Sequence, residues 1–317
     1  MTTVITTAQI DACLDFPSLI DALSSAFCGG IITPVRHHHH VARKDADATL
    51  LLMPAWTQSQ ISPAYLGTKV VTVYPGNGAR ALPSVMGSYL LMDGATGEPL
   101  AVLDGARLTL WRTAAASALA GRHLVRKSAR RMLMVGAGAL APFFIKAHAS
   151  QHALDDIAIW NRSPDAANKL AGQLAAEGLP VRLADDLENE VRAADLVSCA
   201  TLSTAPLVLG DWLKPGAHLD MAGAFNLSMR EADDAALHRS RVFVDTQAAL
   251  TEGGDVAVAI KAGAYRADQV AGDLAALCGG SVTGRTSDDQ ITLFKSVGTA
   301  LEDLAAAMLV WQQHAKA

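Results

Sequence analysis

Apolar residues in the first third of the chain follow two different spacings. Between residues 8 and 29 they recur every three or four positions, which predicts one or two amphipathic helices with an apolar face formed by Ile10, Leu14, Leu19, Ile20, Leu23 and Phe27. Short apolar or alternating runs then predict strands at residues 50–53, 66–74, 85–92 and 99–103. The last two runs flank the sequence DGATG, which is typical of a hairpin. We therefore expect a mainly antiparallel sheet in this part of the chain.

The pattern changes beyond residue 104. The Ala-rich stretch 108–124 predicts one long helix, and we place a domain junction in it at about residue 122. Short apolar runs then alternate with helical segments, at residues 132–135, 157–160, 181–183, 196–200, 218–222, 242–245 and 291–294. This alternation is typical of a Rossmann-type, doubly wound parallel sheet. The predicted fold class is α/β, with an α+β domain at 1–122, a Rossmann domain at 123–295, and a C-terminal helix at 296–317 that completes the first domain.

A glycine-rich turn follows the first strand of the predicted Rossmann domain. It has the spacing G-x-G-x-x-A at Gly136, Gly138 and Ala141, and it leads directly into a helix. In such a turn the first glycine permits the sharp bend, and the second lets the backbone approach a pyrophosphate. The N–H groups at the helix start face the phosphates. The turn therefore predicts dinucleotide binding by Gly136, Ala137, Gly138, Ala139 and Leu140.

The end of the second Rossmann strand indicates which dinucleotide is bound. Proteins that prefer NAD usually place Asp or Glu there, on the ribose 2′-hydroxyl. Here the strand ends in Asn161, Arg162 and Ser163, and no carboxylate occurs before Asp165. An arginine can pair with a 2′-phosphate, whereas a carboxylate would repel it. We therefore expect NADPH, with NADH possible and with Arg162 as the main contact.

Composition excludes several other classes of protein. The chain has 317 residues, half of them hydrophobic and 18% charged, with a net charge of −5, which argues against nucleic acid as a partner. The first residues have neither the basic start nor the apolar core of a signal peptide, and no uncharged run approaches the length of a membrane span. The scattered cysteines at 13, 28, 199 and 278 are expected to be reduced core thiols of a cytoplasmic protein.

Four consecutive histidines, His37 to His40, suggest a metal site at first sight. We do not expect a metal, because successive side chains of a strand point to opposite faces, so at most two of the four can converge on one ion. The preferred interpretation is a polar strand that lines a pocket, with Arg36 and one alternate set of histidines facing inward.

Other polar residues lie at the predicted ends of strands. Thr201 and Ser203 follow a Rossmann strand, at the edge where ligands bind, so they are candidate cofactor contacts; the alternative is a pair of solvent-exposed loop hydroxyls. For the acidic residues Glu252, Asp255, Asp273, Asp288 and Asp289, we expect solvation rather than a catalytic or metal-binding role.

Several motifs, taken in order, resemble the ornithine cyclodeaminase/mu-crystallin family. They include GTKVVTVYPGN, the hairpin LPSVMGSYLLMDGATGEPLA, TLWRTAAASALA and ITLFKSVGTALEDL. The VRHHH run, LMVGAGALAPFFIKAHA and VSCATLSTAPLV are most similar to the branch of Δ1-pyrroline-2-carboxylate/Δ1-piperideine-2-carboxylate reductases. The resemblance runs from end to end, and the order and spacing of the motifs make it specific.

The resemblance implies a homodimer in which residues 1–122 bind substrate and also dimerise. The implied activity is NADPH-dependent reduction of a small cyclic imine that bears a carboxylate, which gives L-proline or L-pipecolate. Arg36, Lys69 and Arg112 are then candidates to bind the substrate carboxylate. Lys69 is the candidate proton donor, with His39 or His40 as rivals. The remaining expected contacts are Asn77 with substrate or cofactor, Thr113 with cofactor, and Lys295, Val297 and Gly298 beside the nicotinamide.

One departure from the family pattern affects the expected reaction. Cyclodeaminases carry a catalytic Asp where this sequence has Phe225, which has no acid or base function. Loss of ammonia from ornithine is therefore not expected, whereas reduction of an imine needs no such carboxylate. An alanine dehydrogenase of the same family and a non-enzymatic, crystallin-like binding protein remain alternatives.

Overall fold

The computed structural model describes residues 2–44, 46–80 and 82–316. The chain divides into a first unit, Met1–Arg112 with Thr299–Ala317, and a second unit, Thr113–Gly298. The division lies inside helix α3 (Gly105–Leu124) rather than at residue 122, because an uninterrupted Ala-rich helix carries no change of composition that marks such a point. As predicted, the fold is α/β, with one parallel and one mixed sheet.

The first unit contains a seven-stranded sheet in the order β1-β7-β6-β5-β4-β2, with β3 also paired to β4. Only β1 and β7 run parallel. The strands are β1 (Thr3–Ile5), β2 (Ile31–Ile32), β3 (His37–Val41), β4 (Ala48–Thr57), β5 (Tyr65–Val73), β6 (Val85–Asp93) and β7 (Pro99–Asp104). The helices are α1 (Thr7–Cys13), α2 (Phe16–Phe27), α10 (Ala300–His314) and a 3₁₀ helix at Pro75–Arg80. The predicted helices and hairpin are confirmed, whereas β1 and β2 are too short to show a period.

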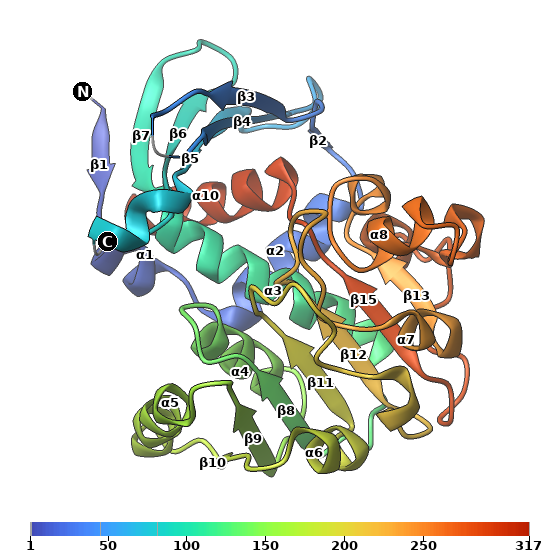
Figure 1. Cartoon of the computed structure of the whole chain (residues 1–317). Coiled ribbons are helices and arrows are strands. Elements are labelled where there is room, and N and C mark those ends of the chain that lie inside the picture. Colours follow the sequence, from blue (N-terminus) through green and yellow to red (C-terminus); the bar gives the residue numbers. More distant parts are fainter. Residues whose placement is uncertain (1, 45, 81, 317) are drawn as a thin grey trace. The chain divides into compact units, whose positions relative to one another are not determined.

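One face of this sheet is buried and the other is partly exposed. Alternate residues of β5, from Tyr65 through Lys69 to Val71, are buried, and α10 packs against β4, β5 and β6 (Figure 1). Helix α10 begins at Thr299, whose hydroxyl caps the backbone N–H of Leu301. Its first turn carries Glu302 and Asp303, which are both fully buried.

The second unit contains an all-parallel sheet in the order β10-β9-β8-β11-β12-β15-β13-β14 (Figure 1). Its strands are β8 (Arg131–Val135), β9 (Asp156–Trp160), β10 (Val181–Leu183), β11 (Leu196–Cys199), β12 (His218–Met221), β13 (Arg241–Val244), β14 (Gly272–Asp273) and β15 (Thr292–Lys295). Its helices are α4 (Ala141–Ala149), α5 (Pro164–Ala176), α6 (Leu187–Ala193), α7 (Asp234–Arg239), α8 (Val256–Lys261) and α9 (Leu274–Cys278). The strand order reverses between β8 and β11, where doubly wound sheets bind ligands.

The cysteines differ from the prediction in their burial. All four cysteines are free thiols, but only Cys199 lies in the core, and Cys28 is exposed because it follows α2 at the surface. Among the residues that the structure describes, no helix combines the length and the apolar character needed to cross a bilayer. Within the same ranges, no group of three or more His, Cys, Asp or Glu side chains is placed to hold a metal ion.

The core of the second unit contains a polar cluster that the sequence did not indicate. Asp220, on β12, accepts hydrogen bonds from Ser198 at 2.7 Å and from Ser117 at 2.8 Å, and its other polar neighbour is His148 at 3.1 Å. His218, also on β12, is fully buried, and its Nδ1 lies 2.9 Å from the hydroxyl of Thr292.

A buried and a half-buried histidine make stability depend on pH: His218 of this cluster, and His152, whose ring stacks on that of His148 with 6.2 Å between the ring centroids. Burial lowers the pKa of His152 to about 4 and that of His218 to about 3, from an ordinary value of 6.5. Between pH 6.5 and 4 the unfolded chain therefore binds more protons than the folded one, so the free energy of unfolding falls as the pH falls. We predict a lower urea midpoint at pH 4.5 than at pH 7, and a smaller difference in His152→Gln. The exposed His38→Gln should behave as wild type; a midpoint independent of pH would contradict this explanation.

Candidate active site

The glycine turn of the second unit has the shape that a dinucleotide needs. Gly136 follows β8 with φ +112°, and a Cβ there would lie 2.8 Å from the carbonyl oxygen of Ala200, so only glycine fits. A Cβ on Gly138 would meet no atom within 4 Å, which leaves open space beside the start of α4. Ala141 is buried at that start. The N–H groups of Gly136 and Ala137 donate to Trp160 and Asn161, so the turn offers a pyrophosphate the backbone N–H groups of Gly138, Ala139 and Leu140.

The segment after β9 lies beside this turn. The side chain of Asn161 accepts a hydrogen bond from the backbone N–H of Ala137 at 3.3 Å and donates one to the carbonyl of Ser163 at 3.0 Å. Ser163 is the N-cap residue of α5, and both Arg162 and Ser163 are exposed. Asn161 therefore positions the loop, and Arg162 extends from the carboxyl end of the strand.

The hydroxyls after β11 are not solvent-exposed loop groups. Thr201 donates its backbone N–H and its hydroxyl to Glu231, at 2.7 and 2.9 Å. Ser203 is buried, and its hydroxyl donates to the carbonyl of Ala205 at 2.6 Å. Both hydroxyl protons thus serve the local fold, and any contact of these residues with a cofactor would have to use their oxygen lone pairs.

The segment after β15 is also held by buried acids. Asp245 accepts hydrogen bonds from the hydroxyl of Ser296 and from the backbone N–H groups of Val297 and Gly298, at 3.0, 2.7 and 2.6 Å. Burial raises the pKa of Asp245, although these donors oppose the shift. Lys295 is fully buried and lies 3.3 Å from the carboxylate of Asp255. The predicted solvation of Asp255 is therefore wrong: it is 1% exposed because Lys295 pairs with it.

In the first unit, two of the predicted substrate-binding cations lie in one buried group of charges. We call Lys69, Arg112, Glu302 and Asp303 the ion-pair cluster. Lys69 Nζ and Arg112 Nε donate to Asp303 at 2.8 and 3.0 Å, and Arg112 Nη1 donates to Glu302 at 2.7 Å. The side chains of the cations are 3% and 7% exposed, and both carboxylates are fully buried. The cluster holds two positive and two negative charges. The sequence motifs did not predict that these four residues would pair.

The charges of the cluster alter one another's ionisation. Burial lowers the pKa of Lys69 to about 8, although Asp303 opposes the shift. Burial alone would raise the pKa of Asp303, but the nearby Lys69 and Arg112 hold it below its ordinary value. Asp303 is therefore ionised at neutral pH, and Lys69 is a cation that loses its proton slightly above neutrality.

The structure does not bring His39 or His40 close to Lys69. In the paired strands β3, β4 and β5, His40 lies opposite Thr49 and Lys69 lies opposite Met53, which puts both on one face of the sheet; His39 lies on the other. Their partners on β4, Thr49 and Met53, are four residues apart, about 13 Å along the strand, and β4 also separates the strands of His40 and Lys69. Its Nε2 lies 2.9 Å from Asp47, and all four histidines are exposed. These positions make Lys69 and His40 poor partners for proton exchange.

The other predicted residues lie as follows. Arg36 is half-buried and precedes β3, and Thr113 is buried in α3. Asn77 is buried in the 3₁₀ helix, where its amide donates to the carbonyl of Pro83 at 2.8 Å and so stabilises the loop.

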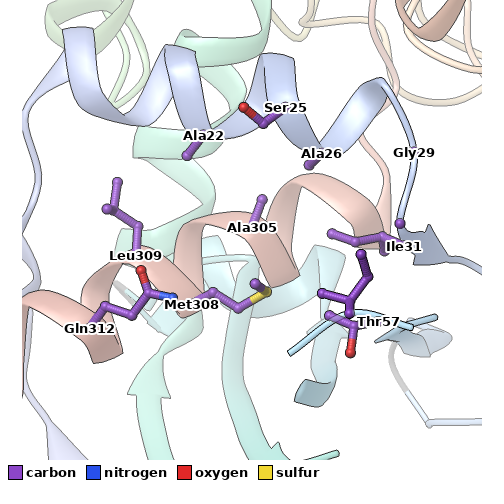
Figure 2. A pocket seen from close by; sticks show the side chains of 12 residues that line it. Ala22, Ser25, Ala26, Gly29, Ile31, Thr57, Ala305, Met308, Leu309 and Gln312 are labelled. Atoms are coloured by element: carbon purple, nitrogen blue, oxygen red, sulfur yellow. The ribbon is translucent and has the colours of Figure 1, made fainter. Parts of the chain in front are cut away.

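The first unit also has a hollow whose lining contains no residue of the ion-pair cluster. A cavity of about 280 Å³ lies between α2 and α10, and Ala22, Ala26, Met308 and Leu309 are among the residues that line it (Figure 2). No charged side chain lines it within the described part of the chain. A carboxylate therefore finds no ionic partner among the residues that line it.

The chain is similar to known proteins over almost its whole length. The model of the Ornithine cyclodeaminase/mu-crystallin family matches residues 2–317. The Δ1-pyrroline-2-carboxylate reductase of Colwellia psychrerythraea is 34% identical over 310 residues, which cover 96% of each chain. Protein SAR DEFICIENT 4 of Arabidopsis thaliana is 42% identical over 289 residues, which cover 90% of this chain and 88% of that protein.

A solved structure is similar over almost the whole chain. The Δ1-pyrroline-2-carboxylate reductase of Thermococcus litoralis, in complex with NADH and L-proline, matches with a TM-score of 0.93 and 27% identity. The match covers 99% of this chain and 98% of that one. The family model and the relatives above 30% identity agree: the chain belongs to the ornithine cyclodeaminase/mu-crystallin family.

Proposed function

We propose that this protein is an NADPH-dependent reductase of cyclic ketimines, which converts Δ1-pyrroline-2-carboxylate to L-proline and Δ1-piperideine-2-carboxylate to L-pipecolate. The observation that carries the proposal is the buried, charge-balanced ion-pair cluster of the first unit. The similarity to two Δ1-pyrroline-2-carboxylate reductases and the open glycine turn support it.

The cluster suits a substrate that carries both charges. A protonated cyclic imine with a carboxylate has a net charge of zero, like the cluster itself. Lys69 and Arg112 attract the carboxylate, and Arg112 favours a planar two-oxygen partner. Asp303 and Glu302 lower the cost of burying these cations before substrate arrives, and they favour a cationic ring nitrogen nearby. Arg36 remains a candidate for a third contact with the carboxylate.

The glycine turn and Asn161, Arg162 and Ser163 would hold the dinucleotide. When bound, NADPH supplies the hydride that reduces the imine carbon, while the protein supplies orientation and charge. Lys69 is our candidate for the proton on the ring nitrogen, because its pKa of about 8 lets it carry a proton at neutral pH and also release it.

Arg162 should determine the preference for NADPH. It is exposed after β9, and no carboxylate lies between the end of β9 and Asp165. Arg162→Asp replaces a partner of the 2′-phosphate by a charge that repels it, so we expect the ratio of kcat/KM for NADPH over that for NADH to fall by about 100-fold. The measurement is a pair of kinetic titrations on each protein. Lys169→Asp, an equal charge change further along α5, is the control, and an unchanged ratio in Arg162→Asp would remove its proposed role.

The activity itself is tested with four substrates: reduced-cofactor absorbance follows the two imines and pyruvate with ammonia, and an ammonia assay follows ornithine. Pyrroline-2-carboxylate and piperideine-2-carboxylate should be reduced, and proline or pipecolate should appear in equal amount to the NADPH consumed. Oxidation of NADPH with pyruvate and ammonia, but not with the imines, would identify an alanine dehydrogenase. Ammonia release from ornithine would identify a cyclodeaminase, despite Phe225. Inactivity with all of them would favour a binding protein.

We also propose that the protein is a homodimer in which a second copy covers the outer face of the sheet of the first unit. Among the residues of β4 and β5 that alternate with the buried set, Leu52, Trp56 and Leu66 are apolar and only partly buried, and Val70 is 37% exposed. An apolar sheet face of this kind usually has a partner. Sedimentation should give a dimer, Val70→Lys should weaken it, and Val4→Lys, on β1, should not. A monomeric wild type would contradict the proposal.

A further inference from the structure

The carboxylate of Glu231 joins two strand ends in the second unit. Its Oε1 accepts the backbone N–H and the hydroxyl of Thr201, at 2.7 and 2.9 Å, just after β11. Its Oε2 accepts the backbone N–H groups of Gly223 and Ala224, at 2.8 and 3.2 Å, just after β12. Glu231 is fully buried, and burial raises its pKa although Lys295 opposes the shift. We call this set of four hydrogen bonds the Glu231 strap.

The Glu231 strap holds the segment at Ala200 and Thr201, which is packed against the glycine turn. A Cβ on Gly136 would lie 2.8 Å from the oxygen of Ala200 and 3.2 Å from Cγ2 of Thr201. A Cβ on Gly223 would lie 2.2 Å from the backbone of Thr201. The segment at 200–201 is thus packed between the glycine turn and the segment after β12. Whatever holds Thr201 in place also holds one side of the dinucleotide-binding turn.

The backbone of Glu231 is fixed independently of its side chain. Its N–H donates to Asp255 at 2.8 Å, and Asp255 adopts a left-handed conformation, with φ +49°, and pairs with Lys295. Its carbonyl accepts the N–H groups of Leu207 and Val208, at 2.8 and 3.0 Å. A change confined to the carboxylate therefore removes the strap and leaves the segment anchored.

We propose that Glu231 is a positioning residue for the dinucleotide: its carboxylate holds Thr201 against the glycine turn, so that the binding edge is formed before the nucleotide arrives. The inference rests on the proposed use of a nicotinamide dinucleotide. A preformed edge spares the cost of ordering the loop on binding, and loss of the strap should therefore lower affinity.

The test is Glu231→Gln. The amide N–H₂ then faces backbone N–H donors, so the hydrogen bonds made by one of the two carboxylate oxygens are lost. Nucleotide affinity is measured by fluorescence titration with NADPH and NADH, without substrate, and amide hydrogen exchange is followed by mass spectrometry. We expect Kd to rise about tenfold or more, which corresponds to about 1.4 kcal/mol. Exchange should also accelerate in segments 200–206 and 222–225.

Asp195→Asn is the matched control. Asp195 is a buried carboxylate of the same sheet that accepts the backbone N–H groups of Arg130 and Arg131 at 2.8 and 3.0 Å, but at the opposite, amino end of β8. It should lower the urea midpoint and leave Kd within about twofold. An equal rise of Kd in both variants would mean that Glu231 acts only through global stability.

The outcomes separate this inference from the proposed function. A wild type that binds neither NADPH nor NADH contradicts the proposed cofactor. A wild type that binds, with an unchanged Kd in Glu231→Gln, overturns the positioning role alone. If Glu231→Gln does not fold, Thr201→Val decides: it deletes only the hydroxyl of the strap and should raise Kd by about twofold to fivefold, and Thr201→Ser should restore it. Equal Kd values for Thr201→Val and wild type would then overturn the proposal.

Discussion

Lys69→Met is expected to lower kcat/KM for pyrroline-2-carboxylate by at least about 100-fold, the usual scale for the loss of a positioned proton donor. Methionine preserves the length of the side chain and removes its charge. NADPH affinity, measured without substrate, should stay unchanged, because the predicted nucleotide contacts lie in the second unit. Stability should fall, because the buried cluster loses one of its two cations, but Asp303 retains its bond to Arg112, so the protein should still fold.

The pH dependence of the wild type gives a second view of Lys69. With a pKa of about 8, its proton is present at neutral pH, so kcat/KM should fall as the pH rises through 8. Its contribution to stability runs the other way. Between pH 8 and the ordinary value of 10.5 the unfolded chain holds the proton that the folded chain has lost, so this contribution rises with pH. A loss of activity that tracks loss of stability would therefore not come from Lys69.

Lys69→Arg distinguishes charge from proton transfer. An arginine keeps a positive charge at all pH values used, so it should bind substrate but lose the fall in activity above pH 8. Near-normal kcat/KM in Lys69→Met would return this residue to a purely structural role in the ion-pair cluster.

Arg112→Met is expected to lower the free energy of unfolding by about 3–5 kcal/mol, because it leaves two buried carboxylates without one of their cations. Asp303 keeps Lys69, whereas Glu302 loses its bond of 2.7 Å to Arg112. The measurement is urea unfolding at neutral pH. The double variant Arg112→Met with Glu302→Gln should recover part of the loss, because an amide costs less to bury than an unbalanced charge.

Arg182→Met is the matched control for that experiment. Arg182 also bridges two carboxylates, Asp156 and Glu190, at 2.7 and 2.6 Å, but its side chain is 40% exposed. Solvent screens such pairs, so we expect a loss of no more than about 1 kcal/mol. Equal losses in Arg112→Met and Arg182→Met would show that burial of the ion-pair cluster has no energetic consequence.

The sequence predicted most helices and strands because local patterns determine them. Apolar runs marked the parallel strands, and the spacing of Gly136 and Gly138 marked the turn whose backbone geometry requires glycine. The shortest elements were missed, such as β14 with two residues, since they contain less than one period.

The pairing of charges was not predictable in the same way. Lys69 and Asp303 lie 234 positions apart, and only the folded chain places them 2.8 Å from each other. Acids in the first turn of a helix are common because they interact favourably with the positive end of the helix dipole. Glu302 and Asp303 therefore did not indicate a buried ion pair. The burial of Asp255 was not predicted either, because it depends on a pairing with Lys295, which is 40 positions away in the sequence. The one available hint was two adjacent acids in the otherwise apolar sequence ALEDLAAAM.

The reaction that we propose for this protein is reduction of the imine carbon by the reduced nicotinamide. It is tested most directly with NADPH dideuterated at C4 of the nicotinamide, pyrroline-2-carboxylate and mass spectrometry of the product. We expect L-proline with one deuterium, on the carbon that bears the carboxylate. Unlabelled proline, or no proline while ornithine yields ammonia, would contradict it.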